Sequence, residues 1–158
     1  MSGTRQEIEP YDYIEHFKRN TALLVSMDKN GKLNVMALDW KTIENFEGNP
    51  VIRAQVAYSR YTYKLLTEGV NEFTINIPSD KISHSVDISG SYSGRNTDKF
   101  KEAGLEIIPG NKSQVPTIKD SDLSYECKIV HTSKSNISSH HYFYGKILAA
   151  YASNNIIK

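Results

Sequence analysis

Short apolar segments separated by turn residues predict a chain built mainly from β-strands. Two apolar runs, 22–27 and 33–38, flank the dipeptide Asn30-Gly31, which supplies the positive φ that a tight hairpin turn requires. Further segments with strand-like patterns lie at 51–58, 72–78, 123–132 and 141–151. Because these segments follow one another in hairpin-compatible order, they favour an antiparallel barrel over a doubly wound parallel sheet.

Three short helical patterns interrupt the strands, at 59–69, 79–89 and 96–105. The first runs from Ser59 as N-cap to Gly69 as C-cap, and both residue types are favoured at those positions. The third begins at Asn96 or Thr97 and stops near Gly104, where glycine again favours a helix end. The expected fold is therefore a β-barrel with a few short α-helices.

The chain shows no division into separate parts. No repeat, low-complexity segment or linker interrupts its 158 residues, so residues 1–158 are expected to form one domain. Residues 1–20 are polar with scattered aromatic residues and are predicted to form an arm or a short helix at the edge. They lack the apolar core of a signal peptide, and no apolar run approaches the ~20 residues that span a bilayer. A cytoplasmic protein that does not enter a membrane is expected.

Charge and composition narrow the function classes. With 19 Lys and Arg against 18 Asp and Glu, the net charge of +1 gives no electrostatic footprint for nucleic acid or an anionic membrane. The single cysteine, Cys127, is predicted to be a small buried hydrophobe. It forms no metal-ligand spacing with the scattered His16, His84 and His131, so no metal site is expected. The 10 tyrosines suit half-buried interfaces and favour a dimer.

Two places combine a predicted helix start with an arginine, as an anion site would. At the first, Ser59, Arg60 and Thr62 surround the helix start, where unpaired backbone N–H groups and the helix dipole favour a phosphate. At the second, Arg95 stands in the glycine-containing segment 89–97, whose glycines allow close backbone approach to a ligand. Each place taken alone is better explained by an ordinary helix cap beside a solvated arginine, and the presence of two such places favours the phosphate site.

A flat aromatic ligand could lie against Met36–Trp40, where a strand of small and apolar residues ends in Asp39. Such a ligand needs an apolar wall and backbone groups that reach its polar edge. The alternative is a core strand with Trp40 as a core aromatic residue. His140 and His141 begin another strand, where a histidine could orient a redox ring or assist proton transfer, or simply be solvated.

Six segments occur in a fixed order: NVMALDW, SRYTYKLL, EFTINIP, SGRNTDKFKEAGL, YECKIV and HHYFYG. In this order they resemble the flavin reductase-like, FMN-binding split-barrel family, and most closely its flavoredoxin-type branch. The similarity covers roughly Thr21 to Ala150, and the ordered set is specific although each motif is weak alone. The resemblance implies a split β-barrel and a homodimer that binds FMN at the subunit interface.

The resemblance also assigns candidate site residues. The cofactor-binding candidates in or just before the matching segments are Asn34, Met36, Ala37, Leu38, Asp39, Trp40, Ser59, Arg60, Tyr61, Thr62, Ser89, Gly90, Ser93, Gly94 and Arg95. The FMN phosphate is assigned to the helix start at 59–62 and to Arg95, and the isoalloxazine ring to Met36–Trp40. His140 matches the family's histidine and is assigned to the hydride donor's side. Residues 98–100 are interpreted as structural support for the loop.

Three positions depart from the family's pattern. Ser89-Gly90 stands where the family often has Cys-Gly, which closes a cysteine-dependent electron route at that position. Asp39 stands where small residues are commoner, and a carboxylate near the ring could alter its redox potential or exclude substrates. Ser139, before the histidine, replaces a frequent aspartate.

The resulting prediction is an FMN-binding, flavin reductase-like oxidoreductase. It would pass electrons from NADH or NADPH through FMN to free flavin, a redox partner protein or another small acceptor. The sequence has no glycine-rich dinucleotide fingerprint, so a nicotinamide donor would not bind through a Rossmann unit. Two alternatives stay open: an FMN-binding electron carrier without nicotinamide turnover, and a non-catalytic flavin-binding module.

Overall fold

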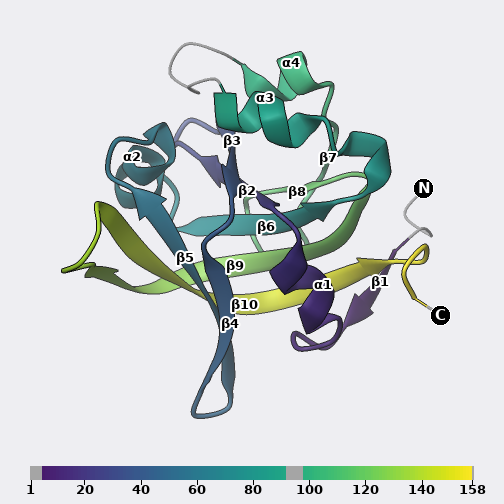
Figure 1. Ribbon diagram of the computed structural model, residues 1–158, viewed down its shortest axis with the longest axis horizontal. Helices are drawn as coiled ribbons and strands as arrows, with labels where there is room; N and C mark the ends of the chain where they lie inside the picture. The colour runs from purple at the N-terminus through teal and green to yellow at the C-terminus, as the bar shows by residue number, and fades with distance from the viewer. Residues whose placement is uncertain (1–4, 92–97, 158) are drawn as a thin grey trace.

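The computed structural model describes residues 5–91 and 98–157, and it shows a strongly curved antiparallel sheet with short helices outside it (Figure 1). The sheet consists of β1 (Arg5–Ile8), β2 (Ala22–Met27), β3 (Leu33–Leu38), β4 (Lys41–Phe46), β5 (Asn49–Ala57), β6 (Glu72–Pro78), β9 (Ser121–Lys134) and β10 (His140–Ser153). Its strand order is β3-β2-β6-β9-β10-β5-β4, with β1 paired to β10. Two short strands, β7 (Ile107–Ile108) and β8 (Thr117–Ile118), form a separate pair. The predicted mainly β barrel with a few short helices is confirmed.

The two ends of the large sheet, β3 and β4, are consecutive strands. β3 pairs with β2 and β4 pairs with β5, so the chain crosses from one end of the sheet to the other at Asp39 and Trp40. A backbone hydrogen bond from the Gln55 N–H to the Trp40 C=O, 3.0 Å long, ties this crossing to β5. In the described ranges β3 and β5 do not pair with each other. We call this unpaired region between β3 and β5 the split in the barrel, and it positions the candidate site.

The barrel core follows the alternation along β6. Phe73, Ile75 and Ile77 are fully buried together inside the barrel, and Cys127 lies among them as predicted. β10 crosses this core at Gly145, where a Cβ atom would lie 2.4 Å from Phe73 Cζ and 2.8 Å from Cys127 Cβ. Since real Cβ atoms do not approach so closely, glycine is required for β10 to reach the core.

The opposite face of β6 and β9 carries polar residues, and it is buried rather than solvated. The Glu126 carboxylate is fully buried and accepts hydrogen bonds of 2.6–3.1 Å from the backbone N–H groups of residues 111–113. Glu72 accepts a further bond of 2.8 Å from the Gln114 N–H. Two strand carboxylates therefore hold the loop that precedes β8 against the sheet.

The helices are α1 (Ile14–Arg19), α2 (Tyr61–Glu68), α3 (Ser85–Ser91) and α4 (Lys99–Ala103), with a 3₁₀ turn at Asp80–Ile82. The predicted Ser59 N-cap is wrong by one residue, because Arg60 is the N-cap of α2 and makes no side-chain capping bond. The predicted C-cap is confirmed, since the Gly69 N–H donates to the Leu65 C=O. The pattern at 79–89 divides into the 3₁₀ turn and α3. None of the described helices is long and apolar enough to cross a membrane.

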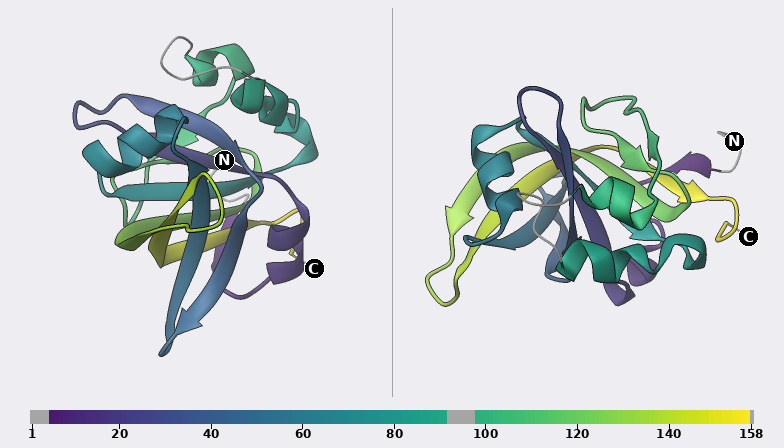
Figure 2. Two further views of the ribbon diagram at one scale, coloured as in Figure 1. Left: turned by 60° about the vertical axis from the view of Figure 1, so that its left-hand side comes forward. Right: turned by 90° about the horizontal axis from the view of Figure 1, so that it is seen from above.

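α4 begins later than predicted. Its N-cap is Asp98, whose side chain accepts a hydrogen bond from the Lys101 N–H, whereas Asn96 and Thr97 lie outside the described residues. The predicted end at Gly104 is confirmed by a left-handed C-cap with φ of 67°. α3 and α4 lie side by side over β2 and β3 (Figure 2), where a second apolar cluster joins the two layers.

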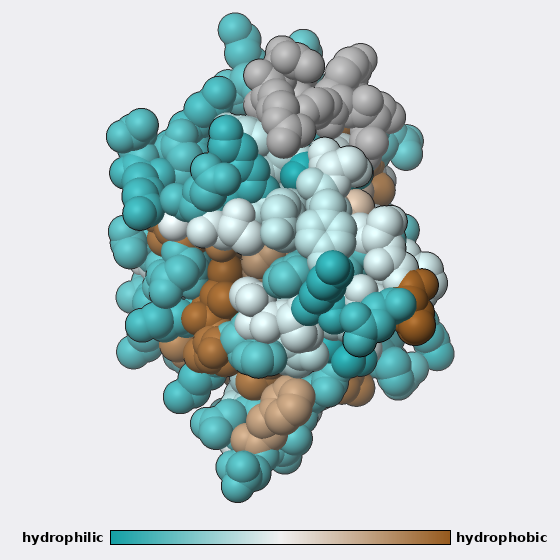
Figure 3. Space-filling view, turned by 90° about the vertical axis from the view of Figure 1, so that its left-hand side faces the viewer, coloured by the Kyte–Doolittle hydropathy of each residue, from teal (hydrophilic) through white to brown (hydrophobic). Residues whose placement is uncertain are grey.

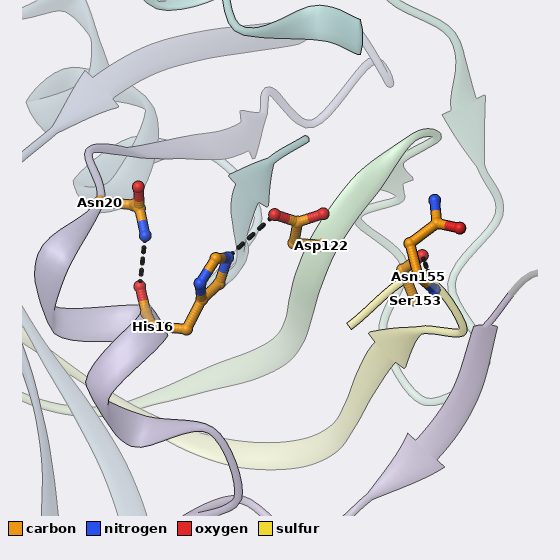
Figure 4. Close-up of polar contacts among 5 residues, drawn as sticks. All are labelled: His16, Asn20, Asp122, Ser153 and Asn155. Atoms are coloured by element: carbon orange, nitrogen blue, oxygen red, sulfur yellow. Dashed lines mark hydrogen bonds and ion pairs between the residues drawn. The ribbon is translucent and has the colours of Figure 1, made fainter. Parts of the chain in front are cut away.

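The prediction for residues 1–20 is half right. The short helix exists as α1, but β1 was missed, and it pairs with the end of β10 so that Arg5 lies opposite Ser153. On α1, His16 Nε2 lies within hydrogen-bond distance, 2.9 Å, of Asp122 Oδ2 at the start of β9 (Figure 4). The pairing places β1 beside the end of β10 on one side of the barrel (Figure 1).

β4 was also missed by the sequence pattern. It forms a hairpin with β5 through Glu47 and Gly48, which have φ values of 53° and 89°, as a tight hairpin turn requires. Polar residues dominate β4, and Phe46 at its end is 45% exposed. A strand at the edge of a sheet buries little apolar surface, so its apolar signal in the sequence is weak.

Candidate functional site

A cleft of about 170 Å³ opens at the split in the barrel. It is lined by Met36, Ala37, Leu38, Asp39, Trp40, Gln55, Ala57, Arg60 and His140. The structure therefore brings together three segments that the sequence had singled out: the end of β3, the start of α2 and the start of β10. The register of β10 against β5 brings the last two segments together, because His140 pairs with Ala57. Ala57 lies just before the turn that leads into α2.

One wall of the cleft is the end of β3. Met36 and Leu38 are buried, whereas Trp40 is 65% exposed, so the alternative of Trp40 as a core residue is wrong. β3 has a partner strand on one side only, and half of its backbone N–H and C=O groups therefore point toward the split. The wall combines apolar side chains with free-edge backbone groups, as a flat ligand with a polar rim requires. Asp39 is exposed beside it and accepts a hydrogen bond from Thr21 Oγ1.

Two cations meet beside the cleft. Lys99 Nζ donates to the Ser89 backbone carbonyl at 2.9 Å, and Arg60 Nη2 donates to the same oxygen at 3.5 Å. Lys99 is 3% exposed; burial first, and then the positive charge of Arg60, lower its pKa to about 8. Burial also lowers the pKa of Arg60. Neither cation forms an ion pair with a carboxylate within residues 5–91 and 98–157.

An unpaired polar atom lies at the same place. Ser89 is fully buried, and its hydroxyl oxygen has no hydrogen-bond partner in the described part of the chain. Buried polar atoms are almost always paired, and the buried Lys99 and half-buried Arg60 favour an anion that neutralises them. Ser89, Arg60 and Lys99 together fit a phosphate group. From the sequence, Lys99 was interpreted as structural support. The structure shows that it is a second cation at this place, but its burial could not be predicted from the residue pattern.

Asn34 and Thr62 lie behind the cleft rather than in its lining. Both side chains are buried, and Asn34 Nδ2 donates to Thr62 Oγ1 at 3.0 Å. This bond fixes the first turn of α2 against β3. Ser59 is exposed in the turn before the helix, and Tyr61, the first helical residue, is half-buried. Thr62 keeps its own hydroxyl hydrogen for a further acceptor.

His140 and His141 have different surroundings. His140 lines the cleft, and its Nδ1 is buried without a hydrogen-bond partner among the residues described. His141 Nδ1 lies 3.3 Å from the Tyr58 hydroxyl, and its ring contacts the rings of Tyr58, Tyr63 and Phe143 at centroid distances of 5.1–5.7 Å. Burial lowers the pKa of His141. His140 is therefore the histidine available to a ligand in the cleft.

The remaining candidates fall at the end of α3 and on the segment after it. Gly90 belongs to α3, whereas Ser93, Gly94 and Arg95 lie outside the described residues. In the rest of the chain, no three His, Cys, Asp or Glu side chains are close enough to hold a metal ion.

Comparison with known proteins identifies the family. Residues 14–157 match the model of the flavin reductase like domain. A protein of Pyrococcus abyssi is 34% identical over 133 residues, which cover 84% of this chain and 73% of the relative. A protein of Archaeoglobus fulgidus is 30% identical over 117 residues, or 74% of this chain and 64% of the relative. This chain thus spans less than two thirds of the second relative.

A solved structure is similar over most of the fold. Flavoredoxin of Desulfovibrio vulgaris superposes with a TM-score of 0.77 and is 29% identical, with 88% of this chain and 72% of that chain covered. On the family model and these similarities, the chain belongs to the flavin reductase-like family of FMN-binding split-barrel proteins.

Proposed function

We propose that the cleft binds FMN and that the protein is an oxidoreductase that takes electrons from NADH or NADPH. The acceptor would be free flavin, a redox partner protein or another small molecule. The observation that supports this most is the meeting of Arg60, Lys99 and the unpaired Ser89 hydroxyl beside an apolar, free-edge wall. A phosphate and a flat ring need this combination of neighbours.

Each group has a part in holding the cofactor. Arg60, Lys99 and the hydroxyl of Thr62 would bind the phosphate, together with Ser59 and Arg95 as the sequence predicts. The backbone at the end of β3 would bind the polar edge of the ring, and Trp40 would cover it at the rim. When bound, FMN supplies the electron-accepting chemistry. His140 Nδ1 would orient the donor or hold a proton at the ring edge.

We further propose that the protein works as a homodimer with FMN between the subunits. The cleft in one chain has a volume of about 170 Å³, well below the ~300 Å³ at which pockets for cofactor-sized ligands begin. Figure 3 shows that apolar side chains interrupt the polar surface on the face that carries α2 and the β9–β10 hairpin. Trp40, Val130 and Ile137 are 65%, 56% and 93% exposed. A second copy would cover such residues and complete the cleft.

A visible absorption spectrum tests the proposal. The purified protein is measured before and after FMN is added and the excess removed, and then with NADH or NADPH without air. A flavin spectrum that bleaches supports the oxidoreductase. A flavin spectrum that persists favours an electron carrier, which the likeness to a flavoredoxin also suggests. A colourless protein that takes up no FMN contradicts the proposal.

His140→Ala separates catalysis from binding. If His140 serves the donor, this change slows reduction by the nicotinamide more than it weakens FMN binding. His131→Ala is the control, because His131 is exposed on β9 and does not line the cleft. Equal losses of reduction and binding in His140→Ala, or no loss of either, would contradict the assigned role.

A further inference from the structure

A second cavity, of about 240 Å³, lies at the opposite end of β10 from His140. It is formed where β1 pairs with the end of β10 and where the chain enters β9, and Ser153 and Asn155 belong to its lining (Figure 4). His140 and Ser153 are the first and last residues of β10, so about 40 Å of strand separates the two sites. This cavity is therefore distinct from the cleft proposed for FMN.

Arg5 is the central cation of the cavity. Its guanidinium carbon lies 4.1 Å from the centroid of the Tyr151 ring, and Nη1 donates to Thr117 Oγ1 at 3.0 Å. Burial lowers the pKa of Arg5. Among the residues that the structure describes, no carboxylate lies within ion-pair distance of Arg5. The nearby Glu126 is occupied, because it accepts the three backbone hydrogen bonds of the loop.

The other charges of the cavity add to its positive potential. Lys81 and Lys119 also line it, and Asp120 is the one acidic side chain in the lining. Asp120 Oδ2 lies 3.6 Å from Lys81 Nζ. Lys119 Nζ lies 3.5 Å from Oε2 of Glu106, which does not line the cavity. Among the described residues, the lining therefore contains three cationic side chains and one carboxylate. Exposed pairs of this kind hold their ions weakly, so an anion can compete for the lysines.

We propose that this cavity binds a small oxyanion, a carboxylate or a phosphate group, through the guanidinium of Arg5. The stacked ring of Tyr151 holds the guanidinium plane in place, and a planar fork of N–H donors suits both kinds of oxyanion. The volume of about 240 Å³ lies below the range of drug-sized ligands, ~300–1,000 Å³. The cavity therefore fits a small metabolite or the anionic end of a longer one.

Amide NMR on the full-length protein with FMN added tests this proposal. Inorganic phosphate and succinate are titrated separately while chloride keeps the ionic strength constant. The expected result is a saturable shift of the Arg5, Thr117 and Tyr151 signals with one or both anions, and the tighter anion shows which group the cavity prefers. Arg5→Gln should weaken binding about tenfold or more. The control Arg19→Gln removes the same charge from an exposed position on α1 and should leave binding unchanged.

Two results would overturn the proposal. One is the absence of any saturable shift up to about 100 mM of either anion, beyond which binding carries little free energy. The other is an equal loss in Arg5→Gln and Arg19→Gln, which would indicate a general charge effect. If Arg5→Gln does not fold, Arg5→Lys keeps the charge but loses the planar fork and should also weaken binding. FMN affinity should be the same in all these variants, so failure here is distinct from failure of the flavin proposal.

Discussion

At the scale of single residues, the proposed phosphate site would depend on Arg60 and Lys99, two cations that donate to one carbonyl oxygen. Arg60→Ala should weaken FMN binding by about 1.5–3 kcal/mol, the value of a charge-assisted hydrogen bond, and Lys99→Met should have an effect of similar size. Lys101→Met is the matched control, because Lys101 is exposed on the same helix. A flavin fluorescence titration gives the affinities. If Lys99→Met and Lys101→Met bind FMN equally well, Lys99 does not contact the phosphate.

The low pKa of Lys99 also predicts a pH dependence of FMN binding. A phosphate dianion binds the protonated lysine, so the pKa of Lys99 is higher in the complex than the value of about 8 in the free protein. Between these two values FMN affinity falls as pH rises, by up to about tenfold per pH unit. Titrations from pH 7 to about 9.5 measure the slope, which Lys99→Met should abolish. A slope that persists in this variant would assign the titration to another group.

At the residue scale, several residues that the sequence singled out line one cleft, and their role toward a ligand stays a prediction. Met36–Trp40, Arg60 and His140 were all expected at the site, and they meet there. Lys99 was missed because the pattern DKF resembles an ordinary helix start, and only packing of α4 against α3 shows that the lysine is buried. Asn34 was assigned to the ligand, but its amide is bonded to Thr62 behind the wall.

At the scale of elements, the polar face of β6 and β9 shows where alternation misleads. A polar residue between apolar ones is normally read as solvent-facing, yet Glu72, Thr74, Asn76 and Glu126 are all buried. Their partners come from the loop 111–118, which lies far away in the sequence. Strand positions were predictable from the local pattern, but the covering of their outer face depends on contacts between distant segments.

This arrangement predicts a large effect of Glu126→Gln on stability. The amide keeps one acceptor oxygen and turns an NH2 group toward backbone N–H donors, so the change should lower the free energy of unfolding by about 2–3 kcal/mol. Glu106→Gln is the control, because Glu106 is exposed and its one ion pair among the described residues is with Lys119. This change should alter stability by less than about 0.5 kcal/mol. Urea unfolding measures both variants. Similar midpoints would show that the carboxylate charge does not hold the loop.

At the scale of the whole molecule, the order of hairpin-compatible strands was enough to predict the barrel. Four strands escaped prediction. β1 and β4 are peripheral and bury few apolar side chains, and β7 and β8 are only two residues long each. The split itself was not predictable from periodicity. It depends on the strand order, in which β3 and β4 are the edge strands at opposite ends of the sheet. The position of the cleft is thus a property of the topology, while the residues that line it were visible in the sequence.

If the proposed dimer forms, the exposed Trp40 would couple assembly to FMN binding at the scale of the whole molecule. If a second copy covers the rim of the cleft, Trp40→Glu should convert a dimer to a monomer and weaken FMN binding together, because the cleft loses one wall. Ile107→Glu is the control, since Ile107 is 44% exposed on the separate strand pair of β7 and β8. Size-exclusion chromatography with light scattering gives the mass, and a flavin titration gives the affinity. A monomeric parent protein that binds FMN tightly would contradict the dimer and leave the cleft of one chain as the complete site.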